Sequence, residues 1–212
     1  MSANLDLARS VRPPPSERLT YEAFLDWCDE DTLAEWIDGE VLMASPASER
    51  HADLGSFLLA VLRFWADDSR LGKVYAAPFQ MRLPEPQRRG REPDILFVRA
   101  EHRDRLRNTY LDGAADLVVE IISPESVGRD RGEKFVEYEQ AGVEEYWLID
   151  PDRRQAEFYQ LGPDGRYHLV LGGARGEYRS EVLPDFRLSV DWLWQDPLPR
   201  VSEVVRALGF AS

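Results

Sequence analysis

The sequence lacks the marks of a membrane-spanning, secreted or disulfide-stabilised protein. Its 212 residues contain no apolar run near the roughly 20 residues of a membrane-spanning helix. The first 19 residues lack the apolar core of a signal peptide. Cys28 is the only cysteine, which excludes an intrachain disulfide and any metal site built from several cysteines. We therefore expect a cytoplasmic protein with no membrane partner.

Basic residues are also in short supply. The chain has 26 Lys and Arg against 39 Asp and Glu, which gives a net charge of −13 at pH 7. Because phosphate affinity comes mostly from Lys and Arg, this balance argues against nonspecific coating of nucleic acid. Eight arginines nevertheless lie close together in the sequence: Arg82, Arg88, Arg89, Arg91, Arg99, Arg103, Arg105 and Arg107. They are either solvated loop charges or a positive strip that contacts phosphates beside a nucleic-acid site.

Apolar residues are plentiful enough for one folded domain. They make up 43% of the chain, which suffices for a single core. Residues 1–18, with three consecutive prolines, predict a disordered or loosely packed arm, and residues 19–212 a single domain. Thr20 can cap a short helix, and an Asp38-Gly39 pair between two apolar runs predicts a β-hairpin. From His51 onward, apolar residues fall on one face of a long helix.

The rest of the domain alternates strands and helices. We expect one strand over residues 73–83, a short strand at 93–98 and a buried strand at 115–123. A helix at about 130–141 and a strand at 144–150 follow, then a second hairpin and a tail. This order predicts an α/β or α+β domain, in which helices flank a mixed β-sheet and a β-hairpin extends the N-terminus.

The strand predicted to be most buried, at residues 115–123, contains an acidic residue. Glu120 lies in ADLVVEIISPES, and burying it ionised would cost several kcal/mol without a partner. Asp94 begins the preceding strand and Lys134 lies in the following helix, so both can fold back beside Glu120. Two carboxylates suit Mg²⁺ or Mn²⁺, which keep several waters, and a lysine can offset charge on a phosphate. This set predicts metal-assisted phosphodiester hydrolysis.

The same residues carry a family resemblance. Pro93-Asp94 followed by Glu120-Ile121-Ile122 resembles the PD-(D/E)XK nuclease superfamily, in which two acids bind metal. A lysine there follows the second acid by two positions, where this chain has Ile122. The resemblance implies a restriction-endonuclease-like fold and requires the lysine to come from elsewhere.

More specifically, the chain resembles the Uma-type family, whose members are classed as restriction endonucleases. The shared motifs follow one another over residues 19–190: EWIDGE (35–40), Ser45-Pro46, His51, EPDILFV (92–98), LVVEIISP (117–124), Asp130 with Lys134, and AGVEEYWLIDP (141–151). Each motif is weak alone, but their order is specific.

The resemblance implies a role for each matching residue. Asp94 and Glu120 would bind Mg²⁺ or Mn²⁺, with the backbone carbonyl of Ile121 as a third ligand. Lys134, on the helix after the strand, would replace the missing lysine, orient water and offset charge. Structural interpretations stay open: Asp94 as a turn acceptor, Glu120 in a salt bridge to an arginine, and Lys134 as a solvated charge paired with Asp130.

Two further residues have weaker assignments. Glu40 is a catalytic candidate that could reach the metal or a nearby water, or it is an exposed hairpin acid. His51 either contacts phosphate at the start of the long helix or packs there.

We therefore expect a Mg²⁺-dependent DNA endonuclease, and a homodimer because double-strand cutting needs two sites. The alternatives are a catalytically inactive nuclease-fold protein that binds nucleic acid or protein, and an α/β protein whose acids bind a structural cation.

Overall fold

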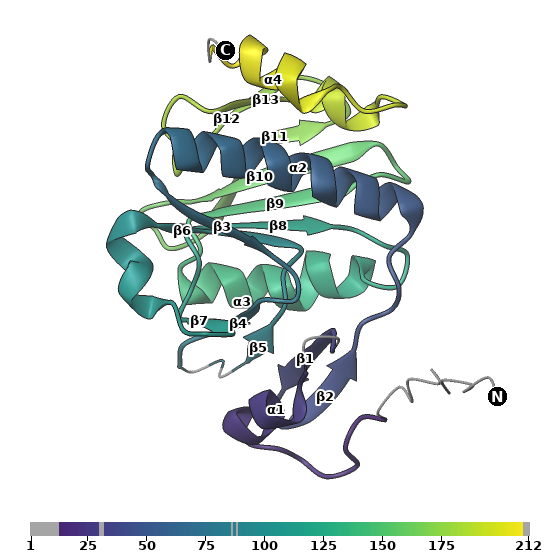
Figure 1. Cartoon of the computed structure of the whole chain (residues 1–212), viewed down its shortest axis with the longest axis vertical. Coiled ribbons are helices and arrows are strands. Elements are labelled where there is room, and N and C mark those ends of the chain that lie inside the picture. The colour runs from purple at the N-terminus through teal and green to yellow at the C-terminus, as the bar shows by residue number, and fades with distance from the viewer. Residues whose placement is uncertain (1–12, 30–31, 86, 88, 210–212) are drawn as a thin grey trace, which may run out of the picture.

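Two mixed β-sheets, with one helix between them, form the core of the computed structural model (Figure 1). The structure describes residues 13–29, 32–85, 87 and 89–209. The helices are α1 (Tyr21–Trp27), α2 (Glu49–Asp68), α3 (Lys134–Ala141) and α4 (Val201–Ala207), with 3-10 turns η1 (Ala100–Arg105) and η3 (Val190–Trp194) and a π-helical turn η2 (Arg129–Glu133). The strands are β1 (Ala34–Ile37), β2 (Glu40–Met43), β3 (Gly72–Ala76), β4 (Gln80–Arg82), β5 (Gly90–Arg91), β6 (Ile95–Arg99), β7 (Tyr110–Asp112), β8 (Leu117–Ile121), β9 (Glu145–Asp150), β10 (Gln155–Leu161), β11 (Tyr167–Gly173), β12 (Glu177–Arg179) and β13 (Arg187–Ser189).

The larger sheet has six strands in the order β11-β10-β9-β8-β6-β3. Strands β8 and β9 are parallel and are joined through η2 and α3, whereas β6 and β8 are antiparallel. Ile95 of β6 lies opposite Val119 of β8, so the same register brings Asp94 opposite Glu120. The predicted adjacency of these two strands is confirmed.

Alternation along β8 assigns its side chains to two different cores. Val119 and Ile121 belong to the apolar core that α2 completes with Leu54 and Leu58. Val118 belongs to a second core, which lies on the opposite face of the sheet. Because successive side chains point to opposite faces, Glu120 shares the face of Val118, which α3 covers. The acid therefore faces the helix that carries Lys134.

The smaller sheet has five strands in the order β2-β1-β5-β4-β7. Met81 and Leu111 of this sheet pack in the same core as Tyr138 of α3, which places α3 between the two sheets. Helix α1 packs on the β1–β2 hairpin through an aromatic cluster that includes Tyr21 and Phe24. The hairpin joins the smaller sheet through the pairing of β1 with β5, and together with α1 it projects below α3 in the view of Figure 1.

Several local predictions are confirmed. The Thr20 side chain accepts a hydrogen bond from the backbone of Ala23 and caps α1. Asp38 and Gly39 both have positive φ in the turn between β1 and β2, as a two-residue hairpin requires. Helix α2 buries the apolar face predicted for it. The mixed α+β fold class is also confirmed.

The single strand predicted over residues 73–83 is wrong. The segment forms β3 in the larger sheet and β4 in the smaller one, and a cis bond joins Ala77 to Pro78 between them. A proline has no N–H to donate to a sheet ladder, so the chain leaves one sheet there and enters the other. The part of the chain after β11 also contains a small antiparallel pair, β12 and β13.

The predicted N-terminal arm, residues 1–18, falls largely outside the described residues, which begin at 13. In the part of the chain that the structure describes, no helix is long and apolar enough to cross a membrane.

Candidate functional site

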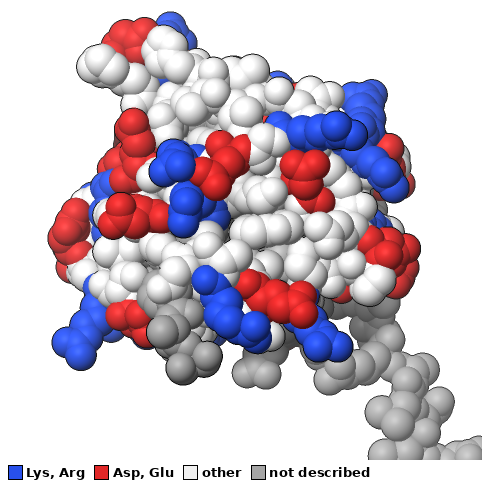
Figure 2. All heavy atoms as spheres, turned by 90° about the horizontal axis from the view of Figure 1, so that it is seen from above, with Lys and Arg blue, Asp and Glu red and all other residues white. Residues whose placement is uncertain are grey.

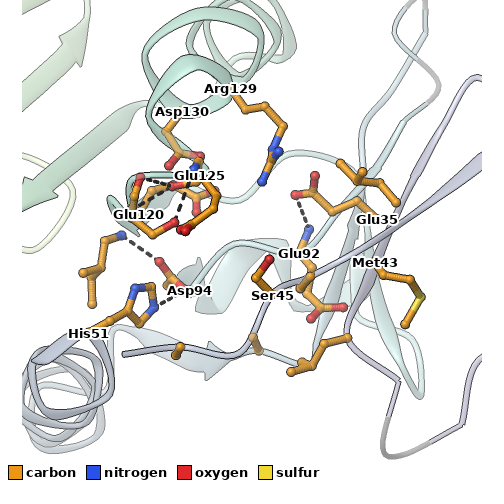
Figure 3. A pocket seen from close by; sticks show the side chains of 18 of the residues that line it. Glu35, Met43, Ser45, His51, Glu92, Asp94, Glu120, Glu125, Arg129 and Asp130 are labelled. Atoms are coloured by element: carbon orange, nitrogen blue, oxygen red, sulfur yellow. Dashed lines mark hydrogen bonds and ion pairs between the residues drawn. The ribbon is translucent and has the colours of Figure 1, made fainter. Parts of the chain in front are cut away.

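A pocket of about 290 Å³ opens beside the ends of β6 and β8. The start of α2, the loop after β2 and the η2 turn complete its walls (Figure 3). Its charged lining comprises six acids and two cations: Glu35, Glu92, Asp94, Glu120, Glu125, Asp130, Arg129 and Lys134. Apolar and small side chains from β2 and the loop after it, including Met43 and Pro46, also line the pocket. The pocket thus combines an excess of negative charge with an apolar part of its lining.

Asp94, which immediately precedes β6, is held in place by two hydrogen bonds. Its Oδ2 accepts from the backbone N–H of Ile121 at 2.6 Å, and its Oδ1 lies 3.0 Å from His51 Nε2 (Figure 3). Ser48 caps the helix that presents His51. The hydrogen bond to Asp94 raises the pKa of His51. Asp94 is 24% exposed in its side chain, so it is fixed in place yet open to the pocket.

Glu120 lies deeper and has lost most of its contact with water. Its Oε1 accepts hydrogen bonds from Lys134 Nζ at 2.9 Å and from the Tyr138 hydroxyl at 3.0 Å. Burial raises the pKa of Glu120 well above its ordinary value, and Asp130 and Asp94 raise it further. Lys134 offsets only part of this effect. Additional positive charge in the pocket, such as a bound cation, would favour the ionised form of Glu120.

Lys134 is buried and shared among three carboxylates. Its Nζ lies 2.9 Å from Glu120, 3.1 Å from Glu35 and 3.4 Å from Asp130. Burial alone would lower the pKa of Lys134, but these three acids outweigh it and raise the pKa well above the ordinary lysine value. The ammonium therefore stays charged. The interpretation of Lys134 as a solvated helix charge is wrong, although its pairing with Asp130 is present.

Glu35 was not predicted as part of the site. It lies on β1, and its Oε2 accepts from Arg91 Nη1 at 2.9 Å while its Oε1 faces Lys134. Burial raises the pKa of Glu35, but Lys134 and Arg91 outweigh burial, and the net pKa is lowered. The EWIDGE motif pointed to this segment, and the acid that enters the pocket is its first residue rather than Glu40.

The structure does not bring Glu40 into the pocket. Glu40 is the first residue of β2, and its side chain is 72% exposed. Its Oε1 lies 3.2 Å from Nη2 of Arg18. In contrast, Asp94, Glu120, Ile121, Lys134 and His51 all line the pocket. The sequence therefore predicted the site residues that the larger sheet and α3 supply. It missed Glu35, which the β1–β2 hairpin supplies.

The predicted positive strip stays a prediction, and most of its described arginines are paired with acids. Arg91 has no exposed surface, and its Nε and Nη2 bond Glu137 at 2.7 and 2.8 Å. Five arginines have carboxylate partners within 4 Å: Arg82, Arg89, Arg91, Arg99 and Arg107. Arg88 lies outside the described residues. These five arginines are therefore paired with acids of their own chain. On the face of the molecule seen in Figure 2, basic and acidic side chains are interspersed.

The donor set fits a hydrated hard cation. Asp94 and Glu120 offer carboxylate oxygens, and the buried Asp130 Oδ1 makes no hydrogen bond, although it lies 3.4 Å from Lys134 Nζ in an ion pair. Among the described residues, no three His, Cys, Asp or Glu side chains are arranged to hold one metal ion. Mg²⁺ commonly binds through one or two carboxylates and keeps several waters, so it does not need such a cage.

Comparisons with known proteins agree with this architecture. A crystal structure described as that of "a putative nuclease belonging to DUF820 from Anabaena variabilis ATCC 29413" superposes with a TM-score of 0.68 at 18% sequence identity. The alignment covers 83% of this chain and 97% of that one, and it shows a shared fold. No curated protein matches the chain. The sequence profile of one family matches residues 21–191, and the chain therefore belongs to the Uma2 family, described as "Putative restriction endonuclease".

Proposed function

We propose that this protein is a divalent-metal-dependent endonuclease that hydrolyses phosphodiester bonds of DNA. The observation that supports this most strongly is the placement of Asp94 opposite Glu120 at one end of the sheet, with Lys134 Nζ 2.9 Å from Glu120. Membership in a nuclease family supports the reaction class. The excess of acids in the pocket supports recruitment of a cation.

Each residue has a distinct part in the proposed site. Asp94 and Glu120, with the carbonyl of Ile121, would hold Mg²⁺ or Mn²⁺. The cation, when bound, supplies positive charge that polarises a phosphate and makes water easier to deprotonate. Lys134 stays protonated and would offset negative charge that develops on the scissile phosphate. His51 keeps Asp94 oriented through the 3.0 Å contact.

A nicking assay on supercoiled plasmid DNA tests the proposal. We expect cleavage with Mg²⁺ or Mn²⁺, none with a chelator, and none with Asp94→Asn. Calorimetry with Mn²⁺ should show that Asp94→Asn weakens metal binding. Glu40→Gln is the matched control, because Glu40 is an exposed acid outside the pocket, and it should cleave as wild type does. Absence of cleavage by wild type in both metals refutes the proposal.

A non-catalytic binding module is the second candidate, and the internal pairing of most described arginines favours a protein partner over DNA for such a module. That function predicts DNA or protein binding with no cleavage under any metal. Metal-dependent melting without either activity would instead indicate a structural cation. The homodimer stays a prediction, and light scattering would separate it from a monomer of 24.4 kDa.

A further inference from the structure

We propose that Glu35 is the positioning residue for Lys134, so that the N-terminal hairpin completes a site otherwise built on the larger sheet and α3. The inference rests on the proposed function for its consequence in catalysis. Its structural part, that Glu35 holds the Lys134 ammonium in place, is independent of any activity.

The three carboxylates around Lys134 come from different parts of the fold. Glu120 lies on β8 and Asp130 on the η2 turn that runs into the lysine's own helix. Only Glu35 reaches the ammonium from the smaller sheet, and its Oε1 is 3.1 Å from Lys134 Nζ. The Lys134 ammonium therefore binds a carboxylate from each sheet, Glu120 on β8 and Glu35 on β1.

Glu35 is itself held firmly from the other side. Its Oε2 lies 2.9 Å from Nη1 of Arg91, which has no exposed surface. Glu137 fixes Arg91 through two further hydrogen bonds at 2.7 and 2.8 Å. The backbone N–H of Glu92 also points to Glu35 Oε1 at 3.4 Å (Figure 3). A carboxylate with both oxygens bound in this way has little freedom to move.

The arrangement lets Lys134 remain in place when Glu120 is engaged elsewhere. If Glu120 were the main partner of the ammonium, a cation that binds Glu120 would have to break that pair. With Glu35 present, the ammonium keeps a full carboxylate partner while Glu120 turns to a cation. Without Glu35, only Asp130, at the longer distance of 3.4 Å, would remain beside Glu120, so Lys134 and a cation would compete more strongly for Glu120 and the lysine would be less ordered.

Glu35→Gln tests this directly, because it keeps the size of the side chain and removes its charge. We expect Mn²⁺ affinity, measured by calorimetry, to fall by about 10–100-fold, the loss typical of residues that support a metal site from outside its ligands, because Lys134 would then compete for Glu120. In metal-free protein, the Nζ protons of Lys134, followed by NMR, should exchange with water at least about 10-fold faster. In the nicking assay, kcat should fall much more than KM. Glu35→Asp should restore part of each property.

Glu145→Gln is the control for nonspecific destabilisation. Glu145 is a fully buried acid on β9 that accepts hydrogen bonds from Ser180 and from two backbone N–H groups, and it does not line the pocket. We expect it to lower the melting temperature without changing Mn²⁺ affinity or exchange at Lys134.

The outcomes separate the two proposals. A folded Glu35→Gln variant with unchanged Lys134 exchange and unchanged Mn²⁺ affinity overturns the positioning role. So does an equal change in both properties in Glu145→Gln, or failure of both Glu35 variants to fold. If the Lys134 and Mn²⁺ changes appear but wild type never cleaves DNA, the endonuclease proposal fails and the positioning role stands.

Discussion

Replacement of Glu120 by glutamine separates a metal ligand from a structural salt-bridge partner. The substitution keeps the shape of the side chain and removes one charge from a residue that is only 4% exposed. The amide oxygen of glutamine can still accept hydrogen bonds from Lys134 and Tyr138. Lys134 also keeps Glu35 and Asp130 as charged partners. The variant therefore leaves no buried charge unpaired.

The expected change in stability is small because two effects oppose each other. A hydrogen bond to a charged group contributes about 1.5–3 kcal/mol and a neutral one about 0.5–1.5 kcal/mol, so the exchange costs about 1 kcal/mol. Burial and neighbouring acids raise the pKa of Glu120, which means that they disfavour its ionised form. A glutamine carries no charge, so the variant avoids this cost. We expect a melting temperature within about 4 °C of wild type.

Metal binding should respond far more strongly. Loss of one of two carboxylate ligands is expected to weaken Mg²⁺ affinity on the order of 100-fold, or about 2.8 kcal/mol. At a Mg²⁺ concentration of 100 times the wild-type Kd, wild type should gain about 2.7 kcal/mol of stability and the variant about 0.4 kcal/mol. Cleavage should be abolished.

Calorimetry, thermal melting with and without Mg²⁺, and the nicking assay check these values together. If Glu120→Gln unfolds the protein, or lowers its melting temperature by more than about 10 °C, while metal-induced stabilisation of the folded fraction is unchanged, Glu120 is a structural ion-pair partner and the site assignment is wrong.

Three further substitutions test other parts of the structure. Lys134→Ala should keep metal binding, measured by calorimetry, but lower the nicking rate by about 10²–10³-fold, and an unchanged rate would contradict its proposed role. Arg91→Met should lower the free energy of unfolding by about 3–5 kcal/mol, because Glu35 and Glu137 lose their buried partner. The salt dependence of DNA binding should stay the same, because Arg91 is not exposed to phosphate. Burial raises the pKa of Glu145 above its unfolded value, so the folded state binds the extra proton and stability should fall as pH rises above about 4.5 towards the folded pKa. Urea unfolding of Glu145→Gln across this interval should show a flatter pH dependence, and an identical slope would exclude Glu145 as its source.

Structural features that depend on a few neighbouring residues could be predicted from the sequence. The apolar face of α2 and the turn at Asp38-Gly39 depend on the period of a helix and on positive φ, which neighbouring residues determine. The position of Glu120 in a buried strand likewise followed from its apolar neighbours. The strand–helix–strand order from 115 to 149 then indicated that Lys134 would return to Glu120, which the structure confirms.

Contacts between distant segments were not predictable in the same way. The chain changes sheets at Pro78, and the sequence does not say which of two sheets accepts the strand that follows. The sequence shows that the arginines from 82 to 107 lie close together, which suggested a phosphate-binding strip. It does not show that a distant acid, Glu137 on α3, lies beside Arg91.

The sequence by itself determined the family, the fold class and the group formed by Asp94, Glu120 and Lys134, because their motifs lie on adjacent elements of one sheet–helix unit. Only the tertiary structure decided that Glu35 joins them and that Glu40 stays outside. The two acids flank the same hairpin turn, and either could have faced the pocket. The pairing of β1 with β5 places Glu35 next to Arg91 and towards α3, whereas Glu40 begins the outer strand of its sheet. Which of the two acids enters the pocket therefore depends on how the two sheets pack together, and this packing is a long-range contact.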